Sequence, residues 1–147
     1  MTGHPEKARA LFAQGYNCAQ SVLASFCDDL GLDFETALLL ASSFGGGMGK
    51  LREVCGAVSG MFLAAGLKYG YANPTDRTAK NAHYQLIQEL GNEFKTQNGS
   101  IICRELLGLT GKPAKCNQSH SCADYVACAA KILEDKIKSR EETPSLD

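Results

Sequence analysis

Apolar residues recur along nearly the whole chain with the three-to-four-residue spacing of amphipathic helices. No stretch shows the strict alternation of apolar and polar residues that marks a half-buried strand. The pattern therefore predicts an all-α protein, a compact bundle of five to six helices. The predicted helices span residues 6–29 (interrupted by Gly15), 34–44, 53–68, 74–98, 100–107 and 122–138.

Residues at the predicted helix ends support these bounds. Asp33 is placed to cap the second helix, and the glycines at 45–47 end it, because glycine takes the left-handed C-cap conformation at low cost. Asn73 and Pro74 open the fourth helix with a cap residue followed by proline at the first helical position. Gly99 stops that helix. The helix-capping and helix-stop residues thus agree with the helix bounds that the hydrophobic spacing predicts.

Length and charge narrow the class of protein. The 147 residues correspond to a single domain, 1–147, in which we expect 139–147 to be a frayed tail. The formal net charge is −1, from 15 basic and 16 acidic residues, and this indicates neither nucleic-acid binding nor a basic membrane-binding face. The opening residues lack the apolar core of a secretory signal, and the longest nearly apolar run, 56–67, is shorter than the ~20 residues that span a bilayer. We expect a cytoplasmic protein without membrane insertion.

Cysteine is the unusual component of the composition, with seven residues. In the cytoplasm thiols stay reduced, so a cysteine-rich chain favours metal binding or redox chemistry over a disulfide framework. Position and helical phase, at about 100° per residue, select the cysteines that face inward. The inward set is Cys18, Cys55, Cys103 and Cys122. Cys27 and Cys128 fall on the opposite sides of their helices and Cys116 lies in a polar loop, so these three are expected to be incidental.

Three of the inward cysteines, Cys55, Cys103 and Cys122, lie in or near the first turn of a predicted helix. There the unpaired backbone N–H groups and the helix dipole favour an anion. The thiolate is the reactive and metal-binding form of cysteine, and helix N-termini lower thiol pKa values. Buried cysteines also serve as small hydrophobic residues. Four inward cysteines, three of them at helix starts, point to a common site instead.

The same residues carry a resemblance to a known family. The chain resembles the redox-active family labelled C_GCAxxG_C_C, which has four hallmark cysteines and a CGAxxG motif; residues 55–60 read CGAVSG. Further matching segments are 15–21, 45–49, 67–70, 103–108 and the cysteine at 122, so the resemblance covers nearly the whole chain. It implies that the hallmark cysteines are Cys18, Cys55, Cys103 and Cys122, and it implies a redox role without a defined substrate.

The fold is also similar to the N-terminal part of split-Soret cytochromes c, which are dimers with an iron–sulfur centre. The chain has no C-x-x-C-H motif, so covalent haem attachment is not expected. The similarity implies a homodimer. The helix at 53–68 supports this, because it carries Gly56, Gly60 and Gly66 among apolar residues and a small bundle is not expected to bury both of its faces.

Three functions fit four convergent cysteines. The first is an electron-transfer protein whose four thiolates hold an iron–sulfur cluster, in a site built by tertiary packing because ferredoxin spacings are absent. The second is a metal-free thiol–disulfide oxidoreductase. Its attacking thiol would be Cys55, which the glycine-rich loop leaves open to a partner, although the chain lacks a C-x-x-C pair. The third is a structural zinc site, ranked last because zinc ligands usually come in close pairs. The sequence identifies neither a substrate nor a redox partner.

Overall fold

The structure, a computed structural model, describes residues 3–108 and 121–142. These residues form helices and no strand, apart from one isolated antiparallel bridge between Val54 and Ile102. The elements are α1 (His4–Ala13), α2 (Cys18–Ser25), α3 (Cys27–Leu30), α4 (Phe34–Ala41), the 3₁₀ turn η1 (Ser42–Phe44), α5 (Gly45–Met48), α6 (Gly56–Tyr69), α7 (Arg77–Asn98), α8 (Cys103–Leu106) and α9 (Cys122–Glu142). In this part of the chain six helices have eight or more residues, which confirms the predicted all-α bundle.

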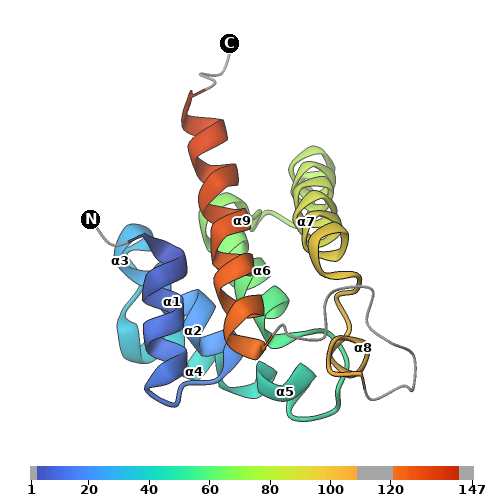
Figure 1. Ribbon diagram of the computed structural model, residues 1–147. Coiled ribbons are helices and arrows are strands. Elements are labelled where there is room, and N and C mark those ends of the chain that lie inside the picture. Colours follow the sequence, from blue (N-terminus) through green and yellow to red (C-terminus); the bar gives the residue numbers. More distant parts are fainter. Residues whose placement is uncertain (1–2, 109–120, 143–147) are drawn as a thin grey trace.

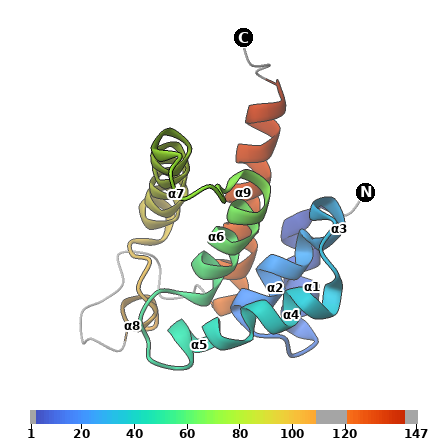
Figure 2. The ribbon, with the colours of Figure 1, turned by 180° about the vertical axis from the view of Figure 1, so that it is seen from behind.

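Helices α6 and α9 lie at the centre of the molecule. Seen from opposite sides in Figures 1 and 2, α1 to α4 lie on one side of this pair and α7 lies on the other. The closest packing is between α1 and α9 and between α2 and α6. The largest fully buried side chains come from α2, α6, α7 and α9 and from the residue between α2 and α3. They are Phe26, Phe94, Leu23, Met61, Leu86, Leu90, Leu133, Val22, Val58 and Val126.

The single helix predicted over 6–29 is wrong, because this segment forms α1, α2 and α3. The chain turns at Gly15, whose φ of 108° is open to glycine and strained for other residues. Asn17 then begins α2 with a capping box. Its side chain accepts a hydrogen bond from the N–H of Gln20 at 2.8 Å, and the Gln20 side chain accepts from the N–H of Asn17 at 3.0 Å. As a result Cys18 is the first residue of a helix.

Helix α6 begins at Gly56, three residues later than predicted. The preceding backbone is extended and pairs with the segment before α8 instead of joining the helix. The Cys55 N–H donates to the carbonyl of Ile101 at 2.7 Å, and the Cys103 N–H donates to the carbonyl of Glu53. This short antiparallel contact lies beside the Val54–Ile102 bridge. It holds the start of α6 against the start of α8.

Helix α7 also begins later than predicted, at Arg77. Asp76 is its N-cap and accepts a hydrogen bond from the Ala79 N–H at 3.0 Å. The Asn73 side chain instead caps a turn by accepting from the Thr75 N–H at 3.0 Å. The predicted stop is confirmed, since α7 ends at Asn98 and Gly99, with a φ of 90°, is its C-cap.

The helix predicted over 34–44 is α-helical only to Ala41 and finishes as η1, and Gly45 after it is extended rather than left-handed. The glycine-rich segment that follows makes a left-handed turn. Every residue from Gly46 to Lys50 has a positive φ, between 57° and 70°, and Arg52 has a φ of 61°. Left-handed backbone costs non-glycine residues roughly 1–2 kcal/mol each. The turn reverses the chain, so the Arg52 N–H reaches the carbonyl of Gly46 at 3.2 Å and the Glu53 N–H reaches that of Gly47 at 2.9 Å. It thereby delivers the chain to the contact with α8.

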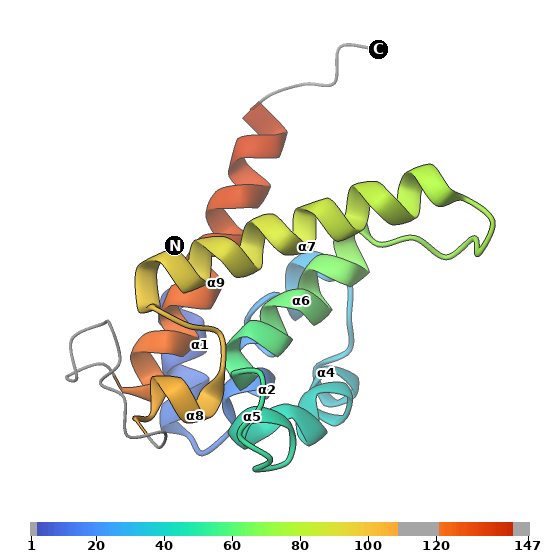
Figure 3. The ribbon, with the colours of Figure 1, turned by 90° about the vertical axis from the view of Figure 1, so that its right-hand side faces the viewer.

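The C-terminal helix α9 continues past its predicted end. Residues 139–142 of the predicted tail are helical, and 143–147 lie outside the described residues. In Figure 3, α7 crosses α9, while α5, α8 and the start of α9 gather at the opposite end of the molecule from the C-terminus. Among the helices described, none is long and apolar enough to cross a membrane.

Two of the three glycines of α6, Gly56 and Gly60, face the inside of the bundle. A Cβ added at Gly60 would lie 2.6 Å from the carbonyl oxygen of Ala19 in α2, and one added at Gly56 would lie 3.0 Å from the Cβ of Cys18. These glycines therefore allow α2 and α6 to pack closely within one chain. Because Gly56 and Gly60 are buried within one chain, they do not require a second copy of the protein to cover them. The homodimer stays a prediction.

Candidate functional site

One small pocket brings the four predicted cysteines together. Its volume is about 40 Å³, and its walls come from α2, α6, α8, α9 and the turn at α5. The four cysteines that line it are Cys18, Cys55, Cys103 and Cys122. Each comes from a different helix, so the site is formed by tertiary packing.

All four pocket cysteines stand at helix N-termini, one more than predicted. Cys18, Cys103 and Cys122 are the first residues of α2, α8 and α9, and Cys55 is the N-cap of α6. The position of Cys18 was missed because 6–29 was taken as one helix. The signal was present in the sequence, since Asn17 with a glutamine three residues later is a capping pattern.

Two glycines let the cysteines approach one another. Gly56, next to Cys55, sits against the Cβ of Cys18 at a distance that leaves no room for a side chain. Gly47 is tighter: a Cβ there would lie 2.6 Å from the Cβ of Cys103, and its φ is 70°. The glycine-rich turn is therefore required for the pocket, which is a packing role that the sequence did not specify.

The Cys18 and Cys122 side chains are hydrogen-bonded to each other. This hydrogen bond, burial and the charges of the neighbouring thiols raise the pKa of Cys18 far above its usual range. The hydrogen bond from Cys18, aided by the charge of Arg52, lowers the pKa of Cys122 to about 6. The two thiols are thus coupled, and Cys122 is the one whose thiolate form is favoured.

Cys55 behaves differently from the expectation drawn for it. The N–H groups of Ala57 and Val58 point toward its sulfur and lower its pKa, without completing a side-chain cap. Burial has the larger effect and raises the pKa of Cys55 to about 12, because the side chain is only 5% exposed. The expected open, activated thiol at Cys55 is therefore wrong, since the protein covers the sulfur that the glycine loop was expected to leave accessible.

Arg52 contributes the positive charge of the site. Among the described residues that line the pocket, it is the only basic one. Its Nη1 donates to the sulfur of Cys103 at 3.8 Å. The Arg52 carbonyl accepts hydrogen bonds from both the backbone N–H and the side chain of Arg104, at 3.3 and 3.1 Å. In the sequence, Arg52 and Glu53 flank the Cys55 segment, and the favoured interpretation is a solvated surface pair. Only folding places Arg52 among the thiols, while Glu53 pairs with Arg104.

The remaining wall of the pocket is largely apolar. It consists of Leu106, Leu107 and Tyr125, together with the glycines already described. Tyr125 is 3% exposed, donates its hydroxyl hydrogen to the Leu106 carbonyl at 3.3 Å and packs against Phe94 with ring centroids 6.0 Å apart. Such a wall limits the access of water to the thiols.

Two of the three cysteines predicted to be incidental, Cys27 and Cys128, do not line this pocket. Cys27 is buried at the start of α3. The Cys128 sulfur accepts a hydrogen bond from the side-chain amide of Asn98 and donates to that of Gln97, both at 3.3 Å. Cys116 lies outside the described residues.

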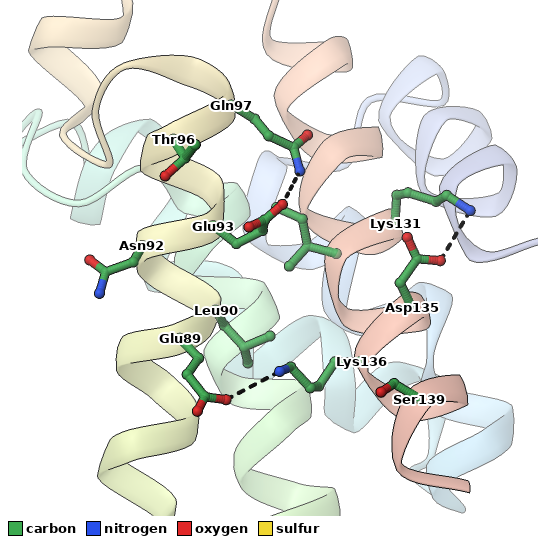
Figure 4. A pocket seen from close by; sticks show the side chains of 11 residues that line it. Glu89, Leu90, Asn92, Glu93, Thr96, Gln97, Lys131, Asp135, Lys136 and Ser139 are labelled. Atoms are coloured by element: carbon green, nitrogen blue, oxygen red, sulfur yellow. Dashed lines mark hydrogen bonds and ion pairs between the residues drawn. The ribbon is translucent and has the colours of Figure 1, made fainter. Parts of the chain in front are cut away.

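Larger hollows elsewhere in the described part do not contain the pocket thiols. A groove of about 560 Å³ between α7 and α9 is lined by charged side chains, which Figure 4 shows paired with one another. Lys136 meets Glu89 and Lys131 meets Asp135, each at 3.1 Å. A hollow of about 830 Å³ beside α1 and α9 includes Cys128. Because these charged groups have partners within the groove, the thiol pocket remains the candidate site.

The six described cysteines are all free thiols. Over residues 3–108 and 121–142, no group of three or more histidine, cysteine, aspartate or glutamate side chains is arranged so that it could hold a metal ion as it stands. The four thiols share a pocket, and the binding of a metal by them is a proposal.

Comparison with known proteins gives one match. Residues 16–136 match the family model described as Putative redox-active protein (C_GCAxxG_C_C). The chain belongs to this family. No curated protein and no solved structure matches the chain.

The C_GCAxxG_C_C family description names redox activity without naming a reaction or a cofactor. The matched residues include all four pocket cysteines and Arg52. The similarity to split-Soret cytochromes c is not addressed by this match. Membership of the family therefore supports a redox role for the protein at the level of the family as a whole.

Proposed function

We propose that Cys18, Cys55, Cys103 and Cys122 bind an iron–sulfur cluster and that the protein transfers electrons. The observation that carries this proposal is the single pocket lined by four thiols from four helices. Four cysteine thiolates are the usual ligand set of such clusters. A redox-active family is the expected setting for this chemistry.

The surroundings of the pocket suit a negatively charged sulfur-rich group. Helix N-termini direct N–H groups toward the thiols, and Arg52 adds a positive charge. A bound cluster supplies one-electron transfer, and hydrogen bonds to sulfur and the exclusion of solvent tune its potential. In this protein Arg52 donates a hydrogen bond to the Cys103 sulfur, and the largely apolar wall of the pocket excludes solvent.

A structural zinc site has less support. Zinc ligands usually come in closely spaced pairs along the chain, whereas each pocket cysteine begins a different helix. Metal analysis of the purified protein separates zinc from iron directly.

The test is anaerobic purification followed by visible absorption and by iron and sulfide analysis. We expect brown protein with iron and sulfide in stoichiometric amounts. Cys55→Ser should lose most of the iron, because a poor substitute for a thiolate replaces one ligand. Cys128→Ser is the matched control and should retain it, since that thiol lies outside the pocket. Colourless protein that is free of iron and zinc, folded, and still carrying four free thiols would contradict the proposal.

A metal-free thiol–disulfide oxidoreductase is the second candidate, and the hydrogen-bonded pair Cys18 and Cys122 favours it. The Cys122 thiolate would attack a disulfide substrate, form a mixed disulfide and release one substrate thiolate. Cys18 would then lose its proton and attack the Cys122 sulfur. That step forms the Cys18–Cys122 disulfide and releases the second thiolate, so the substrate is reduced and the protein dithiol is oxidised. In this function Cys122, rather than Cys55, is the attacking thiol.

The cytoplasm fits either function, because it keeps thiols reduced and the six described cysteines are free. Cytoplasmic location, the homodimer and an electron-transfer partner stay predictions.

A further inference from the structure

We propose that Arg52 is a positioning residue that holds a positive charge at the thiol pocket, stabilises its reduced state and so raises its midpoint potential. This inference rests on the redox function proposed above. It applies to a cluster held by the four thiolates and to a dithiol that becomes a disulfide, since the reduced form is the more negative in both cases.

The guanidinium of Arg52 is directed at sulfur rather than at a carboxylate. Its Nη1 donates to the Cys103 sulfur at 3.8 Å, and its charge reaches Cys122 on the other wall. In the part of the chain that the structure describes, no carboxylate forms an ion pair with Arg52. The neighbouring Glu53 pairs with Arg104, at 3.1 Å. The charge of Arg52 is therefore not neutralised before it acts on the thiols.

The backbone fixes Arg52 in this place. Its φ of 61° lies in the left-handed region, and its N–H donates to the carbonyl of Gly46 at 3.2 Å. Its carbonyl is held by two hydrogen bonds from Arg104. The residue is half-buried, which weakens the screening of its charge by salt. A strained backbone held on both sides thus points a cation into the pocket.

The test uses two variants that both remove the charge of Arg52 but differ in their effect on backbone strain. Arg52→Gln keeps a side chain in the left-handed region, whereas Arg52→Gly relieves that strain. Arg52→Lys restores the charge. Lys50→Gln is the matched control, because it removes a cation from the same turn but from a residue that does not line the pocket. Far-UV circular dichroism confirms that each variant folds.

The first readout is the midpoint potential of the redox-active protein. We expect Arg52→Gln and Arg52→Gly to shift it to more negative values by similar amounts. Arg52→Lys should restore most of the shift, and Lys50→Gln should leave the potential close to that of the wild type. A merely structural role of Arg52 would separate the Gln and Gly variants instead.

The second readout needs no cofactor. Metal-free, reduced full-length protein is alkylated with anionic iodoacetate or neutral iodoacetamide, and the modification of each cysteine is followed by tandem mass spectrometry. Both reagents react with the thiolate, so the ratio of their rates reports the local electrostatic potential and not the fraction of thiolate. At Cys122 we expect both charge-removing variants to lower the iodoacetate-to-iodoacetamide ratio by about fivefold. The ratio at Cys128, outside the pocket, should not change.

Unchanged potentials and unchanged rate ratios in both charge-removing variants would overturn the proposal for Arg52. Equal changes in Lys50→Gln would overturn it as well, because the effect would then be a general property of the turn. Iron-free protein would contradict the cluster alone, since the alkylation ratio still reports on Arg52. The two failures are therefore distinguishable.

Discussion

At Cys55, the start of a helix and the burial of the sulfur act on the pKa of the thiol in opposite directions. The helix N-terminus favours the thiolate, whereas removal from water favours the thiol. At Cys55 burial prevails and the pKa rises to about 12. At Cys122 the hydrogen bond from Cys18 prevails and the pKa falls to about 6. Position at a helix start is therefore not sufficient to activate a cysteine.

This difference predicts the order in which the thiols react. In metal-free protein the alkylation rate of Cys122 should rise with pH through a midpoint near 6, because the thiolate exists above its lowered pKa. Cys55, with a pKa of about 12, should react far more slowly than Cys122 at neutral pH. Cys18→Ala should move the midpoint of Cys122 up toward the ordinary value of 9.0, since it removes the donor. Iodoacetamide labelling between pH 5 and 9, read by mass spectrometry, measures this. Faster labelling of Cys55 than of Cys122 at pH 7 would contradict the assignment.

At the scale of single elements, α6 shows how glycine serves packing. Gly60 lies against the backbone of α2, where a Cβ would approach the Ala19 carbonyl oxygen to 2.6 Å. Gly66, on the same helix, has its nearest such neighbour, His83 Nε2, at 4.0 Å. The first position has no room for a methyl group and the second has ample room.

The two glycines should therefore respond in opposite ways to alanine. Gly60→Ala should lower the free energy of unfolding by about 1–3 kcal/mol, because backbone rather than a flexible side chain must shift. Gly66→Ala should raise it by up to ~1 kcal/mol, since alanine is the better helix former. Urea unfolding followed by circular dichroism measures both. A destabilised Gly66→Ala, or an unchanged Gly60→Ala, would show that the α2–α6 contact is looser than described.

At the scale of the whole molecule, the N-terminus is tied to two distant helices. The His4 imidazole stacks on Phe26, with ring centroids 4.1 Å apart, and lies between the carboxylates of Asp29 in α3 and Glu134 in α9. The Glu134 carboxylate is 2.7 Å from Nδ1 and also accepts from the His4 N–H at 2.8 Å. Burial alone would raise the pKa of Glu134, but the hydrogen bonds from His4 and from Lys138 lower it to about 2. One carboxylate therefore fastens α1 to α9.

This attachment predicts a pH dependence of stability. Because the pKa of Glu134 is depressed in the folded state, its contribution is present above the ordinary value of 4.5 and is lost as the pH falls toward 2. The loss of stability caused by Glu134→Gln should therefore be larger at pH 6 than at pH 3, as measured by urea unfolding. Asp135→Asn is the control, since its exposed pair with Lys131 contributes little. An equal effect of Glu134→Gln at both pH values would show that its ionised carboxylate does not stabilise the fold.

The sequence alone determined the helical class, the end of α7 at Gly99 and the choice of the four cysteines. Each of these depends on local information: hydrophobic period, capping chemistry and helical phase. The break before Cys18 was also encoded locally, in Asn17 and Gln20, but the hydrophobic pattern across 6–29 concealed it.

Only the tertiary structure decided what surrounds each thiol. The Val54–Ile102 bridge and the contact of Gly56 with Cys18 join segments far apart in the chain, and no local pattern reports them. Burial is a property of the assembled bundle, so the pKa of Cys55 could not follow from its place at a helix start. The same holds for Arg52, whose guanidinium reaches Cys103 only because a left-handed turn folds the chain back onto α8.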